Sequence, residues 1–456
     1  MGTERENFKN RLGVLFAMAG SAIGLGNIWR FPYVTAQNGG AAFILVYLIL
    51  MTLICLPVLI SETLLGRRSA SNAISAYGKL VPEAGKAWGK IGYFGVMAAM
   101  CVLSFYCVVG GWSVRYLIDA VTFQITSFDG NYAERFGSYI GSPLPPVLYA
   151  MSFLAITGAV IVMGVKNGIE RMSKIMMSVL LVIIVLVAIR SMTLPGAMEG
   201  VKYMLVPDFS KIDGNVVLAA LGQAFFSMSI GCGTILTYGS YVKKSENLVT
   251  TSILTSAMDV LFAIIAGLAI IPAVFAIASM NGYEPVVDAG PSLVYITLPG
   301  VFKAMPMGAV FAILFFLALL LAAVTSSISM MESMVAFLTE EFRMKRSVSV
   351  ILCIVLCGTV GCFCSLSQGA MANLKLFGLN IFDFFDYISS NILMVCGGFF
   401  MMIFAGWRMK KSDYMDELTN GGTLHIPAWF ARTLYFLVRY LAPLGILAIF
   451  LANLLL

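Results

Sequence analysis

Charged side chains are scarce in this chain of 456 residues: only 11% are Asp, Glu, Lys or Arg, against roughly 25% in an average soluble domain. Apolar residues make up 60% of the chain, and its mean hydropathy is +0.92. These proportions exclude a soluble enzyme, a disordered chain and a nucleic-acid-binding module. The chain is therefore predicted to be a membrane protein that crosses the bilayer several times.

Histidine is almost absent, since it occurs once, at His425. This excludes proton relays and metal catalysis that depend on several histidines. All nine cysteines lie within apolar segments, so no structural disulfide is expected. Cys362 and Cys364 lie two positions apart, but no histidine or further cysteine supports a zinc site there. Because no nucleophile–base set is visible either, the chain is predicted not to be an enzyme.

Long apolar segments with few charges are abundant, and a membrane-spanning helix needs about 20 such residues. The eleven candidate segments lie at 12–29, 31–61, 91–114, 136–165, 175–189, 214–242, 247–283, 304–331, 347–374, 387–407 and 433–456. None of them alternates apolar and polar residues with period two, which argues against an outer-membrane barrel. The first segment has no signal-peptide cleavage site and leads directly into further membrane segments.

The basic residues indicate the orientation in the membrane. If the N-terminus is cytoplasmic, 20 of the 29 Lys and Arg residues fall in inner segments and six fall in outer ones. The positive-inside rule therefore predicts a multi-pass protein of the cell inner (cytoplasmic) membrane with a cytoplasmic N-terminus. The net charge of +6 then reflects topology, and no nucleic-acid partner is expected.

Two segments carry glycine pairs in mid-span, with polar residues beside them. The first reads AMAGSAIGLGNIWRFP (17–32), and the sixth contains GQAFFSMSIGCG (222–233). Taken alone, such glycines are typical of close helix packing in membranes. Their spacing of five spans, however, is the pattern of two inverted repeats with a mid-membrane site between broken helices. Broken helices offer free N–H groups to a carboxylate, and free carbonyls to Na⁺ or an ammonium group.

The predicted fold is an all-α integral membrane protein with 11 transmembrane helices, of which helices 1 and 6 are unwound at mid-membrane. Residues 1–456 form a single domain. Helices 1–5 make up the first inverted repeat at 11–191, and helices 6–10 make up the second repeat at 214–407. One additional C-terminal helix spans 429–456.

Several motifs resemble the bacterial neurotransmitter:sodium symporters, the amino-acid-transporting branch of the leucine-transporter fold. Besides the two glycine motifs, they are NGGAAF (38–43), AGPSLVYITLP (289–299) and AAVTSSISMM (322–331). The resemblance implies sodium-coupled symport of an amino acid into the cell by alternating access, with two Na⁺ sites and no organic cofactor. A sensor that binds an amino acid without net transport stays open as an alternative. A channel is disfavoured because no repeated filter sequence is visible.

The resemblance also implies the ligands of both sodium ions. The first site would use Ala22, Asn27, Ser227 and Thr255, where Thr255 stands in place of the usual asparagine. The second site would use Gly20, Ile23, Ala322, Thr325 and Ser326. Without the resemblance, the hydroxyls at 325–327 would equally be explained as caps on carbonyls of their own helix.

The same resemblance implies a substrate site built from both broken helices and two further spans. Its residues are Ser21, Ala22, Gly24, Leu25, Gly26, Val102, Tyr106, Phe226, Ser227, Ser229, Cys232, Ser326 and Met330. Gly24 stands where monoamine carriers of the family have Asp, so the substrate must bring its own carboxylate. Cys232 stands where the family often has Phe, which enlarges the pocket and favours a hydrophobic or aromatic amino acid.

Asp259 is the most informative charge within a span. Chloride-dependent relatives hold their ion at positions matching Tyr47, Gln223 and Ser227, and Asp259 would place a carboxylate there. Chloride-independent transport is therefore expected, and the carboxylate is also a candidate to take up a proton on the return step. The alternative is that Asp259 serves helix packing alone.

Two charged pairs match the gates of the family. Arg30 and Asp386 match the outer gate, whereas Arg5 and Glu340, with Tyr241, match the inner gate. Exposed ion pairs contribute only about 0–1 kcal/mol, which suits contacts that break in every cycle. The remaining charges in or near spans are interpreted as structural: Glu62, Arg115, Asp119 and Glu332. The sequence leaves the oligomeric state open; a homo-oligomer is compatible with it.

Overall fold

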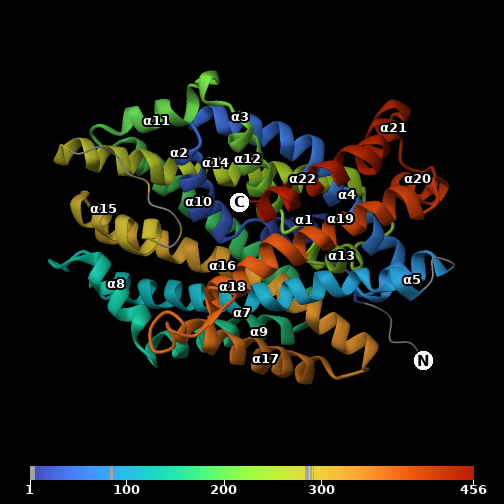
Figure 1. The fold of residues 1–456 in the computed structure, drawn as a ribbon, viewed down its shortest axis with the longest axis horizontal. Coiled ribbons are helices and arrows are strands. Elements are labelled where there is room, and N and C mark those ends of the chain that lie inside the picture. The colour runs from blue at the N-terminus through green and yellow to red at the C-terminus, as the bar shows by residue number, and fades with distance from the viewer. Residues whose placement is uncertain (1–5, 83–85, 283–286, 288–289, 291, 456) are drawn as a thin grey trace.

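The computed structural model describes residues 6–82, 86–282, 287, 290 and 292–455. Most of its long helices lie side by side along the longest axis of the molecule (Figure 1). The first half contains α1 Arg11–Ala22, η1 Gly26–Arg30, α2 Phe31–Gln37, α3 Ala41–Leu50, η2 Met51–Cys55, α4 Leu56–Ser69, α5 Ser75–Leu80, α6 Lys86–Gly89, α7 Ile91–Val121, α8 Tyr132–Gly141, α9 Pro145–Val162, η4 Val165–Glu170 and α10 Arg171–Met192.

The second half repeats this helical character and adds one small hairpin. Its elements are α11 Ala197–Leu205, η5 Phe209–Lys211, α12 Gly214–Ser227, α13 Thr234–Gly239, α14 Leu248–Asn281, η6 Leu293–Thr297, α15 Leu298–Ala304, α16 Gly308–Glu341, α17 Arg346–Leu366, β1 Lys375–Leu376, β2 Leu379–Asn380, α18 Ile381–Tyr387, η7 Ile388–Leu393, α19 Met394–Ile403, η8 Phe404–Arg408, α20 Lys411–Thr419, α21 Ala428–Phe436, η9 Leu437–Leu441 and α22 Ala442–Leu455. The strands β1 and β2 pair antiparallel, with Lys375 opposite Asn380.

Nine helical stretches of the described chain are long and apolar enough to cross a membrane. A tenth membrane-spanning stretch is formed by the helices 11–22 and 26–37 together, with a bend of 55° between them. The predicted sixth span consists of α12 and α13, separated by the non-helical residues 228–233. The predicted count of eleven includes this interrupted span and stays a prediction.

The boundary between the first two spans differs from the predicted one. The first span continues to Gln37 and the second begins at Ala41, whereas the sequence pattern placed the break near residue 30. Pro32 lies within the continuous helix 26–37, directly after the π-helical turn η1, and does not end it. The chain reverses instead at Gly39 and Gly40, which have φ of +87° and +62°. Such values are accessible to glycine without strain.

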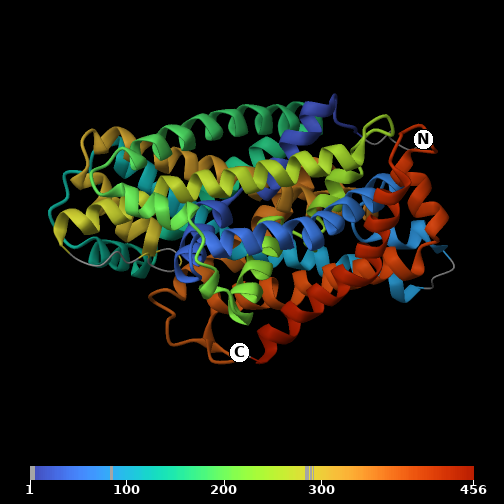
Figure 2. The same ribbon diagram turned by 90° about the horizontal axis from the view of Figure 1, so that it is seen from above.

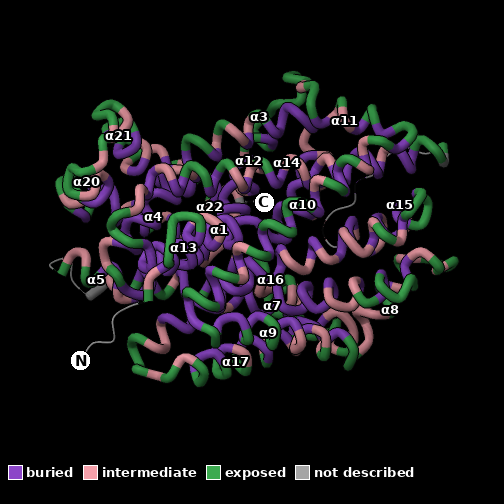
Figure 3. The backbone as a smooth tube through the Cα atoms, turned by 180° about the vertical axis from the view of Figure 1, so that it is seen from behind, coloured by how far each residue is buried: buried purple, intermediate pink, exposed green. Residues whose placement is uncertain are grey.

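The most buried helices meet at the centre of the bundle. The helix α7 packs along α16, and α16 also contacts α1 and α13. Figure 3 shows buried residues concentrated along these central helices, while exposed residues gather at the helix ends and the outer surface. The two interrupted spans therefore lie against the most buried part of the molecule.

Candidate functional site

Both glycine-rich segments lose helical structure at the positions that the sequence indicates. The helix α1 ends at Ala22, because Ile23 adopts an extended conformation (φ −75°, ψ 107°). In the second segment, φ is +50° at Ser229, +81° at Gly231 and +68° at Gly233. A Cβ atom at Gly231 would lie 2.1 Å from the carbonyl oxygen of Met394, so this position admits only glycine.

The two breaks face each other across a central cavity. It is lined by Ala22, Gly24, Leu25, Gly26, Val102, Tyr106, Phe226, Ser227, Ser229, Cys232, Ser326, Met330 and Met394. Twelve of these are residues that the sequence assigned to substrate, and Met394 from α19 is an addition. Ser21 does not line the cavity; its hydroxyl donates to Ser329 Oγ at 2.8 Å, and its carbonyl oxygen accepts from Ser229 Oγ.

The lining of this cavity contains hydroxyl groups but no charged side chain, since no Asp, Glu, Lys or Arg is among the described residues that line it. The N–H of Gly24 donates to Asn27 Oδ1 at 3.0 Å, and the N–H of Leu25 lies 3.5 Å from Tyr106 Oη. A Cβ atom at Gly24 would lie 2.5 Å from Ser326 Oγ. A side chain at residue 24 would therefore displace the Ser326 hydroxyl from the carbonyl oxygens of Gly20 and Ile23.

A buried carboxylate lies beside the cavity, on α14. The side chain of Asp259 is fully buried and accepts hydrogen bonds from Asn27 Nδ2 at 2.8 Å, Ser227 Oγ at 3.0 Å and Tyr47 Oη at 3.3 Å. Asn27 and Ser227, assigned to the first sodium ion, and Tyr47, assigned to the chloride position, therefore belong to one hydrogen-bonded cluster around Asp259. Gln223 instead donates to the Gly26 carbonyl at 3.2 Å.

Thr255 lies one helical turn before Asp259 on α14, so both side chains point to the same face. Its hydroxyl is buried and has no hydrogen-bond partner among the described residues. Buried polar atoms in native structures nearly always have a partner, whether protein, water or ion. This oxygen lies one turn from Asp259, which accepts hydrogen bonds from Asn27 and Ser227, and it is available as a donor to a bound Na⁺.

The residues assigned to the second sodium ion converge where α1 meets α16. Ser326 Oγ reaches across to the carbonyl oxygens of Gly20 at 3.4 Å and Ile23 at 3.3 Å. Thr325 Oγ1 donates within its own helix, to the carbonyl of Ala322 at 3.0 Å. The capping interpretation therefore describes Thr325, whereas Ser326 bonds between helices. These oxygens form an all-oxygen donor set, which suits a hard cation.

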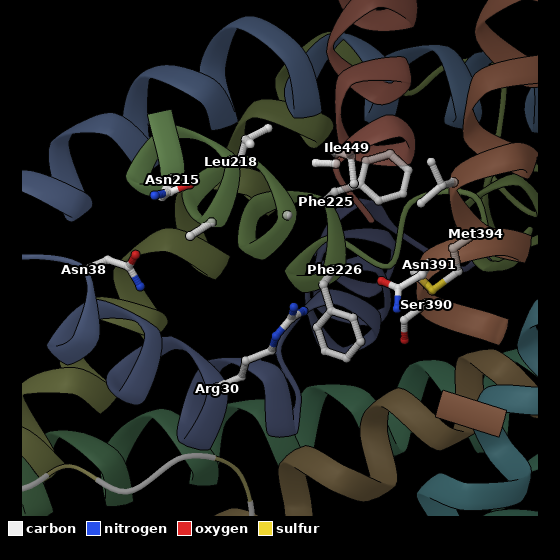
Figure 4. Close-up of a pocket in the computed structure, with 14 residues that line it drawn as sticks. Arg30, Asn38, Asn215, Leu218, Phe225, Phe226, Ser390, Asn391, Met394 and Ile449 are labelled. Carbon is white, nitrogen blue, oxygen red and sulfur yellow. The ribbon is translucent and has the colours of Figure 1, made fainter. Parts of the chain in front are cut away.

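A second cavity of about 390 Å³ opens on one side of the central one. Phe226 and Met394 line both cavities, so they separate the two spaces. The guanidinium of Arg30 lies over the ring of Phe226, 4.4 Å from its centroid (Figure 4). Asp386, its predicted gate partner, accepts a hydrogen bond from Ser390 Oγ at 3.1 Å. In the described part of the chain, no ion pair joins Arg30 to Asp386.

On the opposite side, Arg5 of the predicted inner gate lies outside the described residues. Its predicted partner Glu340 accepts hydrogen bonds from the backbone and the side chain of Asn72, at 2.8 and 3.1 Å. Tyr241 donates to Glu332 Oε1 at 2.7 Å, and Glu332 pairs with Arg346 at 2.5 Å. Sequence reasoning interpreted Glu332 as structural and missed its contact with Tyr241; a charge within an apolar span was the available signal.

The other three charges interpreted as structural lie on helices α4 and α7. Arg115 and Asp119 form an ion pair at 2.8 Å along α7. Glu62 is buried on α4, where it lines a small cavity together with Gly231 and Gly233 of the second break.

Two interrupted helices around an uncharged polar cavity, with a second cavity on one side, define a secondary transporter with its site at mid-membrane. The chain belongs to the sodium:neurotransmitter symporter family, because the sequence model of that family matches residues 5–132 and 145–455. It is thus a sodium-dependent transporter and not an enzyme.

Related proteins agree with this assignment over nearly the whole length. The chain is 40% identical over 446 residues to YhdH of Bacillus subtilis (strain 168), an uncharacterised sodium-dependent transporter, covering 97% of this chain and 96% of that protein. It is 36% identical to an uncharacterised sodium-dependent transporter of Haemophilus influenzae, covering 99% and 98%. The crystal structure of MhsT in complex with L-phenylalanine superposes with a TM-score of 0.89 at 40% identity, covering 98% of this chain and 100% of that one. The predicted family and the leucine-transporter fold are confirmed.

Proposed function

We propose that this chain carries a hydrophobic or aromatic amino acid into the cell together with Na⁺, and that it does so without chloride. The observation that carries the proposal is the central cavity, which has no charged residue among the described residues that line it and has glycine rather than an acidic residue at position 24. A zwitterion suits such a cavity because it brings both of its charges. The structural similarity to MhsT, determined with L-phenylalanine, supports this class of substrate.

Each half of the zwitterion would meet one type of free backbone group. Its carboxylate would meet the N–H groups of Leu25 and Gly26 and the hydroxyl of Tyr106, at the positive end of a helix. Its ammonium group would meet carbonyl oxygens of Ala22 and Phe226, together with the Ser229 hydroxyl. The apolar side chain would extend toward Val102, Cys232, Met330 and Met394, which line the same cavity.

Two sodium ions would hold the broken helices in place. The first would join Ala22 and Asn27 to Ser227 and Thr255, and thus α1 to α12 and α14. The second would join the end of α1 to α16, where Ser326 already bonds across to Gly20 and Ile23. Substrate and sodium would then stabilise the same arrangement of helices, which is the physical basis of coupling.

Charge compensation would come from Asp259. Its carboxylate shares Asn27 and Ser227 with the first sodium site, so a negative charge is present without chloride. Loss of Na⁺ on the inner side would leave that charge buried and uncompensated, which is unfavourable. Uptake of a proton by Asp259 would relieve this during the return step and would produce proton antiport.

The gates would close in sequence around the loaded site. Arg30 would leave the ring of Phe226 and pair with Asp386 as the outer cavity closes. The inner side would then open as the Arg5–Glu340 pair breaks near Tyr241.

Uptake into proteoliposomes tests the proposal. With an inward Na⁺ gradient and gluconate replacing chloride, we expect labelled L-phenylalanine to accumulate, and to fail to accumulate when K⁺ replaces Na⁺. In competition with all twenty amino acids, the aromatic and large apolar ones should displace the label most strongly. Binding without accumulation would instead favour a sensor, and accumulation that ignores Na⁺ would contradict the ion sites.

A further inference from the structure

A basic cleft lies at one end of the bundle, away from the substrate cavity. It encloses about 670 Å³ and is lined by Lys9, Lys166, Arg171, Lys174 and Lys243, together with Glu170. Its three parts are the residues before α1, the junction of η4 with α10, and the segment after α13. Figure 2 shows α10 at the outer edge of the bundle, beside the first described residues.

The cleft carries more positive charge than the protein itself neutralises. Both carboxylate oxygens of Glu170 are already engaged, one by the backbone N–H of Lys9 at 2.6 Å and one by Lys174 Nζ at 2.7 Å. Lys166 and Arg171 make no side-chain hydrogen bond or ion pair with any described residue. A second carboxylate lies nearby, because Glu6 accepts a hydrogen bond from the N–H of Val165 at 2.7 Å. Among the described residues, five cations against these two carboxylates still leave a site that is attractive to an anion.

An apolar surface continues from the cleft along the same helix. Ile175 lines the cleft and is 50% exposed, and the next exposed residues on that face of α10 are Val179, Val182 and Leu186 at 40%, 60% and 46%. Their spacing of three and four residues places them in one stripe. The stripe belongs to the apolar stretch Val165–Met192, so it runs into the membrane from the cleft.

We propose that this cleft binds the phosphate headgroup of an anionic phospholipid in the cytoplasmic leaflet, with an acyl chain along the α10 stripe. A soluble phosphate would use the cations but not the apolar stripe, whereas a phospholipid uses both. Basic pockets at the cytoplasmic ends of transmembrane helices are suited to such headgroups. The proposal rests on the predicted cytoplasmic N-terminus and is independent of which amino acid is transported.

A headgroup in this cleft would act on the transport cycle through its position. Lys9 lies two residues before α1, and Lys243 lies four residues after α13, so the cleft joins the inner ends of both interrupted spans. Lys243 Nζ already donates to the carbonyl oxygen of Lys9 at 3.0 Å. A bound phosphate would strengthen this junction and favour the conformation in which the inner side is closed.

Native mass spectrometry of the purified full chain, titrated with phosphatidylglycerol, tests the proposal. The variant Lys166→Gln/Arg171→Gln/Lys243→Gln should bind this lipid about tenfold or more weakly than wild type, because each basic residue near an anionic headgroup adds attraction. The matched control Lys79→Gln/Lys345→Gln/Lys410→Gln removes three exposed charges on the same predicted side and should bind as wild type does. Equal losses in both variants, or equal binding of phosphatidylcholine, would overturn the proposal.

Two further experiments distinguish a phospholipid from a soluble phosphate and do not depend on the variants. Millimolar inorganic phosphate or glycerol phosphate should not displace the lipid; displacement would point to a soluble ligand and contradict the proposal. With wild-type protein, phosphatidylglycerol that carries a photoreactive group on its acyl chain should label the peptide containing 171–186. Labelling spread evenly over all exposed helices would show ordinary solvation by lipid and would also overturn it.

Discussion

Thr255 is one of several residues whose buried hydroxyl has no hydrogen-bond partner among the described residues. What distinguishes it is its position on the same face of α14 as Asp259. An unsatisfied buried hydroxyl is unfavourable by about 1–3 kcal/mol, so a protein without a ligand at this point would gain stability by losing it. Retention of the hydroxyl is understandable if it coordinates the first sodium ion.

The variant Thr255→Val removes that oxygen while it keeps the shape of the side chain. We expect the Na⁺ concentration for half-maximal uptake to rise about tenfold, since a contact to a charged group contributes roughly 1.5–3 kcal/mol. Thermal stability without Na⁺ should stay the same or increase. Thr251→Val, which removes another unpartnered buried hydroxyl of α14, is the matched control and should leave the Na⁺ dependence unchanged. An unchanged Na⁺ dependence in Thr255→Val would remove this residue from the site.

At the level of single residues, the sequence indicated the cavity well where the chemistry is local to a motif. The lining residues from the two breaks followed from the resemblance of these two motifs to the symporter family, and the glycine pairs indicated the breaks themselves. Met394 escaped notice because an ordinary apolar residue on α19 acquires its position only from helix packing. Ser21 was assigned to the cavity, but its hydroxyl donates to Ser329 instead. A sequence motif does not determine the direction in which a side chain points.

Among the elements, the segment between α12 and α13 depends most closely on its sequence. Gly231 combines a φ of +81° with an approach to Met394 that leaves no space for a side chain. The break is thus fixed both by backbone conformation and by contact with α19. A rigid break of this kind keeps carbonyl groups free for ligands at mid-membrane.

The variant Gly231→Ala should disrupt this element. We expect a loss of at least about 2 kcal/mol in stability, because a left-handed conformation alone costs an alanine about 1–2 kcal/mol. Substrate affinity should fall with it, measured as thermal unfolding and binding of labelled substrate in detergent. Gly222→Ala, in the helical part of α12 with no atom near its Cβ position, should stay within about 1 kcal/mol of wild type. Equal behaviour of the two variants would contradict the assigned role of the break.

Element boundaries were harder to predict than the breaks themselves. The glycine pairs in mid-span predicted where α1 and α12 end. The sequence pattern did not predict the turn between the first two spans at Gly39 and Gly40. The charge at Arg30 and the ring of Pro32 suggested an earlier end, and both are tolerated within the second half of the same span. The length of an apolar run predicts how many residues lie in the membrane. It does not predict at which residue one helix ends and the next begins.

At the scale of the whole molecule, a buried ion pair links distant parts of the chain. Arg67 at the end of α4 is 2% exposed, and its Nε donates to Glu417 of α20 at 2.6 Å. A second nitrogen donates to the carbonyl of Glu246, which follows α13. Lys244 lies 2.5 Å from the other oxygen of Glu417. This junction connects the first half of the chain to α20 and to the segment beyond the second break.

Removal of one partner should be costly. Arg67→Met should lower the unfolding free energy by about 3–5 kcal/mol, because Glu417 would stay buried with less compensation. The double variant Arg67→Met/Glu417→Met should recover much of that loss in thermal unfolding. Arg68→Met removes ion pairs with the more exposed Asp413 and Asp416 and a longer contact of 3.7 Å with Glu417, and it should change stability by no more than about 1 kcal/mol. Similar losses for Arg67→Met and Arg68→Met would contradict a special role of the buried pair.

The ion pair between Arg67 and Glu417 could not be predicted from the sequence. The basic residues near 67 and 68 were interpreted as topology markers, which explains their sign but not their partners. Their pairing with α20 links positions 350 residues apart, and such a distance follows only from the packed bundle. The class of the molecule, in contrast, followed from its scarcity of charge and from the two interrupted spans.

The central claim is that the carboxylate of Asp259 supplies the negative charge that relatives take from chloride. The most direct test is Na⁺-driven uptake of labelled amino acid into proteoliposomes by wild type and Asp259→Ser, each with chloride or gluconate as the anion. Wild type should transport equally in both, and the variant should lose uptake in gluconate and regain it in chloride. Uptake by Asp259→Ser at the wild-type rate without chloride would contradict the account.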